Sequence, residues 1–386
     1  MRIVEVRAVK LNVPRRDGPR TPERRPHWRS LRPPALFLAR YPEFKGLPPM
    51  PRWPSVWAKV TAEDGTFGLG QTNFGDPVAA LIDQHFPLLL VGQDCLATEK
   101  LNDILWRGTK AYGTIGLAAC AISAVDLALW DLKGKLLGQP VYRLLGGPVR
   151  DRQFCYATSD DLDWSQELGF RAFKVSCPAG SWDEDEGLDR IEAHVAAARE
   201  AVGASAALAF NPVMPFDAEY AVRVAERLRP FRLRWLEEPL VPEDLEGHAA
   251  IRKAITWVPL ATGEHHQTRF PFRQLVEQRA VDVLQPEIKS VGGLSECVKI
   301  YHIAEAAGIK VILHAGANNP FGLHFSLAMP NVPWAEYFLG SAPGIPLDEV
   351  ATIPGHRPPH EGYATPSDAP GFGMEIDPAW IEPYFG

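Results

Sequence analysis

The sequence contains few cysteines, and none of them stands in a paired motif. Its five cysteines are scattered along 386 residues, and no two of them form a CxxC pair; they are Cys95, Cys120, Cys155, Cys177 and Cys297. An odd, dispersed set is typical of reduced thiols, whereas small secreted proteins build a framework of paired disulfides. We therefore expect free thiols and a cytoplasmic protein.

An excess of basic residues and a long uncharged hydrophobic run are also missing. The formal net charge is −7, which argues against a nucleic-acid partner because no basic surplus exists to displace phosphate counterions. Residues 15–32 are a local arginine-rich exception; their prolines favour a loop, and a basic arm that binds anions is the alternative. The most apolar helical stretch, residues 116–129, contains Asp126 and is too short to cross a bilayer. We expect no membrane partner.

The first part of the chain has the pattern of a small α+β domain. It begins with alternating charged and β-branched residues, which predict a strand and not a signal peptide. The further expected elements are a hairpin at 56–60 and 66–71 and helices at 78–90, 97–106 and 114–137. Gly138 and Pro140 supply a stop for the last helix.

From residue 154 onward, eight short apolar runs alternate with helix-length segments. The runs are FCYAT, AFKVS, ALAFN, LRWLEEP, PLATGE, VDVLQP, KVILHA and WAEYF. Continuous apolar strands that alternate with helices indicate parallel strands buried on both faces. The predicted fold is α/β, a TIM-type (β/α)8 barrel over residues 126–340, with a capping domain over 1–125. The Pro- and Gly-rich segment 341–386 is expected to pack back on that cap.

Polar residues end most of these runs, where barrel enzymes hold their functional groups. In chain order they are Lys174, Asn211, Glu237, Glu264, Glu287, His314 and Glu336. So many ionisable groups at the ends of apolar strands must meet one another or a cation, since burying an unpaired charge is prohibitive. The oxygen ligands on three successive strands, Asn211, Glu237 and Glu264, suit Mg²⁺.

Two neighbouring glutamates, Glu237 and Glu238, compete for the position that faces into the barrel. Successive strand residues face opposite ways, so only one of them can do so. Glu238 precedes Pro239 in the turn, and we therefore assign Glu237 to the interior. For Glu238 we expect an ion pair outside the barrel.

His314 ends the seventh run, and Glu287 follows the sixth. A carboxylate that holds one imidazole nitrogen raises the basicity of the other, so this pair predicts a general base. A lone histidine in an apolar run such as VILHA is more often a satisfied core residue. The acidic residues one β/α unit away favour the catalytic dyad.

Taken together, these motifs resemble the mandelate racemase group of the enolase superfamily over almost the whole chain. The run AISAVDLALWDLKGKLLGQPVYRLLGG, then WLEEP, TGEHH, LQPEIKSVGGLSE and VILHA stand in the order of that group. The strings GEHHQT, WAEYF and APGFGMEIDP and the HW pair at His27 are most similar to its L-rhamnonate dehydratase branch.

The resemblance implies a Mg²⁺-dependent acid-sugar dehydratase. A base removes the proton α to the substrate carboxylate, and the 3-hydroxyl then leaves to give a 2-keto-3-deoxy acid. The implied metal ligands are Asn211, Glu237 and Glu264. The implied base is His314, oriented by Glu287, and Glu336 hydrogen-bonds the substrate. His265 and His27 are implied substrate contacts, with Arg52 beside them; a homo-oligomer is also expected.

The sequence departs from the family pattern in three places and from the racemase pattern in a fourth. Asn211 stands where an aspartate is usual, and Glu287 is one methylene longer than the usual aspartate. The stretch KGLPPMPRW lacks the expected substrate-binding arginine and has only Arg52 nearby, so we expect a substrate other than L-rhamnonate itself. Lys174 begins a Lys-x-Lys pair in racemases, but the second place here is Ser176.

These departures leave two alternatives to the dehydratase. One is an epimerase that uses Lys174 opposite His314. The other is a barrel that binds an acidic ligand with little or no turnover, because its metal site is eroded at Asn211. We interpret Lys174 as a positive charge that pairs with the substrate carboxylate or with Glu237.

Overall fold

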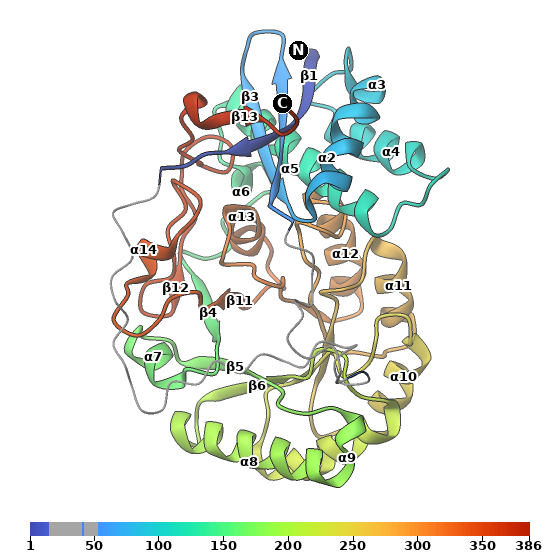
Figure 1. The fold of residues 1–386 in the computed structure, drawn as a ribbon, viewed down its shortest axis with the longest axis vertical. Coiled ribbons are helices and arrows are strands. Elements are labelled where there is room, and N and C mark those ends of the chain that lie inside the picture. The colour runs from blue at the N-terminus through green and yellow to red at the C-terminus, as the bar shows by residue number, and fades with distance from the viewer. Residues whose placement is uncertain (15–40, 42–52) are drawn as a thin grey trace.

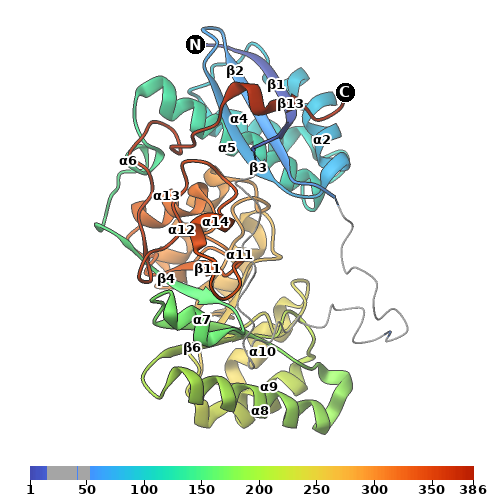
Figure 2. The ribbon, with the colours of Figure 1, turned by 60° about the vertical axis from the view of Figure 1, so that its left-hand side comes forward.

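The computed structural model describes residues 1–14, 41 and 53–386. The arginine-rich stretch at 15–32, with His27 in it, and Arg52 lie outside the described residues, so their predicted roles stay predictions. The chain forms two bodies, a cap that contains both termini and a curled sheet surrounded by helices (Figure 1). Figure 2 shows the cap resting on one end of the barrel.

The cap is built on a four-stranded sheet in the order β13-β1-β2-β3. Its strands are antiparallel and comprise β1 (Ile3–Leu11), β2 (Val56–Ala62), β3 (Phe67–Thr72) and β13 (Ile381–Pro383). The helices of the cap are α2 (Gly75–Gln84), α3 (Phe86–Leu90), α4 (Thr98–Gly108) and α5 (Leu117–Leu137). Most of α5 is buried, and it covers the sheet where Gly68 and Gly70 remove the side chains. A Cβ on Gly68 would lie 2.0 Å from the carbonyl oxygen of Ala128.

The elements of the cap follow the sequence prediction, but the bounds of its helices differ. The expected helix at 78–90 is split into α2 and α3, because Pro87 in the first turn of α3 has no N–H to continue α2. α5 starts at Leu117 rather than at residue 114, and it ends where predicted, with Gly138 in the left-handed conformation at φ 61°.

All eight predicted runs form strands of one parallel sheet, as the sequence predicted. They are β4 (Gln153–Thr158), β5 (Ala172–Ser176), β6 (Ala207–Asn211), β7 (Leu236–Glu237), β8 (Leu260–Thr262), β9 (Val283–Leu284), β10 (Lys310–Val311) and β11 (Ala335–Phe338). The order is β10-β9-β8-β7-β6-β5-β4-β11. Among the described residues no ladder joins β10 to β11; the segment after β10 meets β11 through Ala317 N–H, which donates to the Glu336 carbonyl oxygen at 2.7 Å.

Helices follow the strands on the outside of this sheet. They are α7 (Leu162–Glu167), α8 (Glu184–Val202), α9 (Ala218–Leu228), α10 (Leu245–Ala254), α11 (Arg269–Glu277), α12 (Leu294–Ala306) and α13 (Pro320–Ala328). The connection from the cap contains α6 (Val141–Leu144), and the short α14 (Leu347–Val350) follows β11. The fold is therefore a (β/α)8 barrel with an N-terminal cap, as predicted from the sequence.

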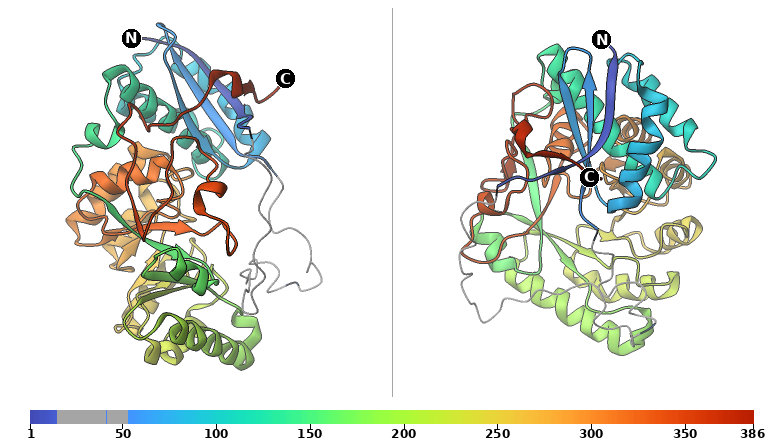
Figure 3. Two further views of the ribbon diagram at one scale, coloured as in Figure 1. Left: turned by 90° about the vertical axis from the view of Figure 1, so that its left-hand side faces the viewer. Right: turned by 45° about the horizontal axis from the view of Figure 1, so that its top comes forward.

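The C-terminal segment touches both bodies. β12 (Tyr363–Ala364) pairs with β4, and β13 pairs with β1 at the top of the cap (Figure 3). The domain borders drawn at 125 and 340 stay predictions, and α5 runs without a break through the first of them.

The interior of the barrel is filled in layers. One layer holds Tyr156, Ala172, Ala209, Trp235, Ala261, Val283 and Ile312. Strand residues two positions apart face the same side. The next layer toward the carboxyl ends of the strands therefore holds Thr158, Lys174, Asn211, Glu237, Gln285 and His314. The alternation of side chains along the strands therefore places a layer of polar side chains next to the apolar layer, on the side of the carboxyl ends of the strands.

Two further expectations from the sequence concern the cysteines and membrane-spanning helices. All five cysteines are buried and unpaired, as expected for reduced thiols. Across the described ranges, no helix is both long enough and apolar enough to span a membrane.

Candidate active site

Lys174 lies at the centre of the polar layer. Its Nζ is 2.6 Å from Oε1 of Glu336, and it also forms an ion pair with Oε1 of Glu237. All three side chains are at most 2 % exposed. Burial alone would lower the pKa of Lys174, but the two carboxylates outweigh it and hold that pKa well above its usual value. Lys174 is therefore a fixed positive charge.

Glu336 is anchored on both of its oxygens. The Thr158 hydroxyl and Lys174 bind Oε1, and the backbone N–H of Ala315 donates to Oε2 at 2.9 Å. Burial tends to raise the pKa of this carboxyl, but the Lys174 ammonium dominates and lowers it to about 2. Glu336 stays ionised and points into the barrel beside Lys174.

Glu237 faces the interior, as alternation along the strand requires, and donors surround its carboxylate. Its Oε1 accepts from Lys174 and from the Asn211 amide at 2.9 Å. Its Oε2 accepts from the Trp235 indole at 2.8 Å and from the Gln285 amide at 2.7 Å. A carboxylate offers about four lone-pair sites, and these four donors use them.

Asn211 is engaged in the same network. Its amide nitrogen donates to Glu237, and its Oδ1 accepts from the backbone N–H of Val213 at 2.9 Å. The predicted ligands Asn211 and Glu237 are thus in contact with each other. Their hydrogen bonds join them to each other and to Lys174, Trp235, Gln285 and the backbone N–H of Val213.

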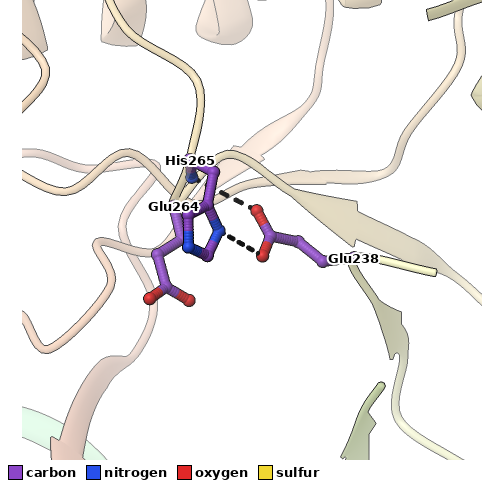
Figure 4. Close-up of side chains that lie close together, drawn as sticks. All are labelled: Glu238, Glu264 and His265. Carbon is purple, nitrogen blue, oxygen red and sulfur yellow. Dashed lines mark hydrogen bonds and ion pairs between the residues drawn. The ribbon is translucent and has the colours of Figure 1, made fainter. Parts of the chain in front are cut away.

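Glu238 lies in the turn after β7, with a positive φ of 39°. Its carboxylate is 1 % exposed and lies 2.8 Å from Nδ1 of His265, so it forms an ion pair with a residue of the candidate site, whereas the sequence predicted one outside the barrel. Ligand atoms of Glu238, Glu264 and His265 all lie within 4.8 Å of one another. Figure 4 shows the His265 ring between the two carboxylates, with both hydrogen bonds to Glu238. These are the donor groups that the described residues gather for a cation.

His314 and Glu287 are also in contact. Nδ1 of His314 lies 2.8 Å from Oε2 of Glu287, and Nε2 lies 3.2 Å from Oε1 of Glu264. Burial tends to lower the pKa of His314, but Glu264 and Glu287 raise it to about 10. In this arrangement the imidazolium form is favoured, and it donates to both carboxylates.

The candidate residues therefore form two adjoining groups. Lys174, Asn211, Glu237 and Glu336 share one network, and Glu264, Glu287, His265 and His314 form the other with Glu238. The sequence analysis missed Gln285, Trp235 and Thr158 as partners of the buried carboxylates. Side chains two positions apart along a strand face the same side of the sheet. Counting in steps of two from the inward-facing residues would therefore have found these three.

The site chemistry fits a divalent cation through the carboxylate oxygens of Glu238 and Glu264. It fits less well at the set predicted from the sequence, because Asn211 and Glu237 have their oxygens occupied by protein donors. Glu264 belongs to both sets. The ligand set Asn211, Glu237 and Glu264 stays a prediction of the sequence.

Comparison with known proteins agrees with the fold. The L-rhamnonate dehydratase of Saccharopolyspora erythraea is 35 % identical over 358 residues, 89 % of each chain. The crystal structure of L-rhamnonate dehydratase from Gibberella zeae has a TM-score of 0.86 and 31 % identity, and covers 99 % of this chain and 96 % of that one. A crystal structure of rhamnonate dehydratase from the same organism, complexed with Mg, has a TM-score of 0.81 and 35 % identity. This match covers 86 % of this chain and 83 % of that one.

Two family descriptions match consecutive parts of the chain. Residues 49–146 match the mandelate racemase / muconate lactonizing enzyme N-terminal domain, and residues 160–380 match the enolase C-terminal domain-like family. With both domains matched in order, and with relatives above 30 % identity over most of its length, the chain belongs to the mandelate racemase group of the enolase superfamily.

Proposed function

We propose that the protein is a Mg²⁺-dependent acid-sugar dehydratase that acts on an aldonate related to L-rhamnonate. The observation that carries the proposal is the contact of His314 with Glu287 on one side and Glu264 on the other. Similarity to L-rhamnonate dehydratases over most of the chain supports the reaction class. The same similarity supports a carboxylate substrate.

The roles of the side chains follow from their contacts. Glu287 holds Nδ1 of His314 and leaves Nε2 to take the proton α to the substrate carboxylate. The imidazolium formed by this abstraction then donates that proton to the 3-hydroxyl as the C3–O bond breaks, and the hydroxyl leaves as water. Glu336, kept ionised by Lys174, is an acceptor for a substrate hydroxyl, and His265 is a donor to the substrate.

A divalent cation held by Glu264 would supply positive charge opposite the substrate carboxylate. The high pKa of His314 depends first on the carboxylate of Glu264. Glu264 and Glu287 together therefore set how readily His314 accepts and releases a proton.

The environment of Lys174 favours the dehydratase over the epimerase. A racemase needs a base on each face of the α-carbon, and Lys174 is held as an ammonium between Glu237 and Glu336. Ser176 at the adjacent inward position donates its hydroxyl to Asp160, and a hydroxyl does not abstract the proton of a carbon acid. Of these groups in the described part of the chain, His314 is then the base.

Protein hydrogen bonds already occupy the carboxylate of Glu237 and the amide of Asn211. They favour one second candidate, a barrel that binds an acidic ligand without turnover. One screen separates the two. Protein supplemented with Mg²⁺ is incubated with aldonic and aldaric acids, L-rhamnonate included, and 2-keto-3-deoxy products are detected. Turnover that the His314→Asn variant loses supports the dehydratase. Thermal stabilisation by an acid with no product from any of them contradicts it.

A further inference from the structure

We propose that the opposite mouth of the barrel, at the amino-terminal ends of its strands, is a second binding site that takes a small aromatic carboxylate. A cavity of about 250 Å³ opens there, and two exposed cations, Arg234 and Lys310, belong to its lining. Pockets for drug-sized ligands are larger, roughly 300–1,000 Å³, so this one suits a single ring that carries an acid group. The site lies away from the catalytic end, and the inference does not depend on the proposed function.

The position of the cavity follows from the strands that surround it. Arg234 lies two residues before β7, and Asp282 lies immediately before β9. Lys310 begins β10, and Trp334 lies immediately before β11. Parallel strands all begin at the same end of a barrel, whereas catalytic groups lie at the other end. The apolar layer, to which Trp235 belongs, therefore separates this cavity from the polar layer.

The floor of the cavity is apolar. It is formed by Trp235, Val283 and Ile312 of the apolar layer, which are at most 5 % exposed. The indole nitrogen is the one polar atom of these three side chains, and it already donates to Glu237 at 2.8 Å. Trp334 stands beside this floor, with its ring centroid 5.7 Å from that of Trp235. The cavity therefore presents aromatic and aliphatic surface to the ring of a ligand.

Arg234 is oriented to bind a carboxylate. Its guanidinium lies over the Trp334 ring, with Cζ 5.0 Å from the ring centroid. Stacking uses the flat face of a guanidinium and leaves the N–H donors at its edge, which match the two oxygens of a carboxylate. In the part of the chain that the structure describes, this guanidinium donates no hydrogen bond and forms no ion pair. Its edge donors are therefore available to a ligand.

The remaining charged residues give the lining an excess of positive charge. The ammonium of Lys310 forms no ion pair with any residue in the described ranges. Among the described lining residues, Asp282 carries the one carboxylate, and Arg252 already holds it, with Nε 2.9 Å from Oδ2 and Nη2 3.1 Å from Oδ1. The backbone N–H of Leu260 also donates to Asp282 at 2.9 Å. Arg252 thus balances the charge of Asp282, and the two cations of the lining remain for an anion.

Floor and cations together select a ligand with two parts. The floor and Trp334 favour a flat ring, because covering apolar and aromatic surface is stabilising. Arg234 and Lys310 favour an anion. Inorganic phosphate would pair with the cations and leave the floor uncovered, whereas a neutral ring would cover the floor and leave the cations unpaired. An aromatic carboxylate satisfies both parts of the site.

The test titrates the full-length protein with 4-fluorobenzoate, and binding is followed by ¹⁹F NMR and by tryptophan fluorescence. We expect saturable binding with a Kd of about 1 mM or tighter, as the best contacts of so small a ligand allow. Neutral 4-fluorobenzyl alcohol and inorganic phosphate should each bind at least about tenfold more weakly, because each lacks one half of the interaction. The affinity for 4-fluorobenzoate should agree within about twofold in Mg²⁺ and in EDTA, because distant sites act independently.

Matched variants assign the signal to this cavity. Arg234→Gln removes the charge and Arg234→Lys keeps the charge without the planar fork, and each should weaken 4-fluorobenzoate binding at least about tenfold. Lys310→Met should weaken it about threefold, since an exposed ammonium contributes less. The controls Arg273→Gln on α11 and Lys253→Met on α10 remove exposed cations elsewhere, and they should leave the affinity within about twofold of wild type.

Four results would overturn the proposal. These are no saturable binding of 4-fluorobenzoate by the wild-type protein, equal affinity for the neutral alcohol, equal weakening by the control variants, and binding that disappears in EDTA. The last would place the ligand at the catalytic end. Circular dichroism checks the folding of each variant, and Lys310→Met decides the question if the Arg234 variants do not fold. All of these are binding measurements, so a failure of the proposed reaction leaves their outcome readable.

Discussion

Acid should destabilise this protein through His324, a buried histidine of α13. Its ring is fully buried, 5.4 Å from that of Phe372 and 5.5 Å from that of Tyr142. The backbone N–H of Tyr142 donates to its Nδ1 at 3.2 Å, so that nitrogen is an acceptor and the ring is neutral. Burial away from water lowers the pKa of His324 to about 3.

The direction and size of this effect on the free energy of unfolding follow from the difference in the pKa of His324 between the folded and the unfolded chain. An unfolded histidine has a pKa of about 6.5, so as the pH falls below that value the unfolded chain takes up a proton that folded His324 refuses. The stabilisation is fully present above about pH 6.5 and is lost as the pH falls toward 3. Between pH 7 and pH 5 the loss is about 2 kcal/mol, from 1.36 kcal/mol per pH unit below the unfolded pKa.

The measurement compares the wild-type protein with His324→Gln, whose side-chain oxygen can still accept from Tyr142. Urea unfolding at pH 7, 6 and 5 gives the free energy of unfolding of each. The lost packing lowers the free energy of unfolding of the variant by the same amount at each pH. The difference in free energy of unfolding between wild type and variant should nevertheless shrink by about 2 kcal/mol from pH 7 to pH 5, because the variant lacks the titrating histidine. His302→Gln, at an exposed position of α12, is the control and should follow the wild-type curve. A disadvantage of His324→Gln that stays constant over this range would refute the reasoning.

Three further predictions concern the site and the thiols. His314→Asn should lower turnover at least about 10²-fold, the rate factor that a general base usually contributes. It should leave the affinity for Mg²⁺ within about threefold. A variant that keeps a tenth of the activity would rule out His314 as the base. In D₂O, loss of the α-proton NMR signal should accompany a keto product without the C2 epimer, whereas an accumulating epimer that Lys174→Met blocks would make the protein an epimerase. The five cysteines are at most 1 % exposed, so a thiol reagent should label none in the native protein and five after denaturation, and rapid native labelling would contradict the buried positions.

The sequence by itself determined the barrel. Each of the eight apolar runs forms its strand, because a short continuous apolar stretch between helical segments has one stable place, inside a sheet covered by helices. The same alternation fixed that Glu237 and not Glu238 faces the interior. It also placed His314 and Glu287 at adjacent strand ends, where their contact at 2.8 Å follows from the spacing of one β/α unit.

Only the tertiary structure decided what the inward residues meet. The sequence left two partners open for Lys174, the substrate carboxylate or Glu237. Because β6 separates the strands of Lys174 and Glu237, their ion pair depends on the curvature of the sheet and on the lengths of both side chains. The turn after β7 brings Glu238 to His265 through a positive φ that no residue pattern signals. The pairing of β13 with β1 joins the two ends of the chain. Periodicity reports which face a residue takes, but contacts between distant segments are set by packing, which a local pattern does not contain.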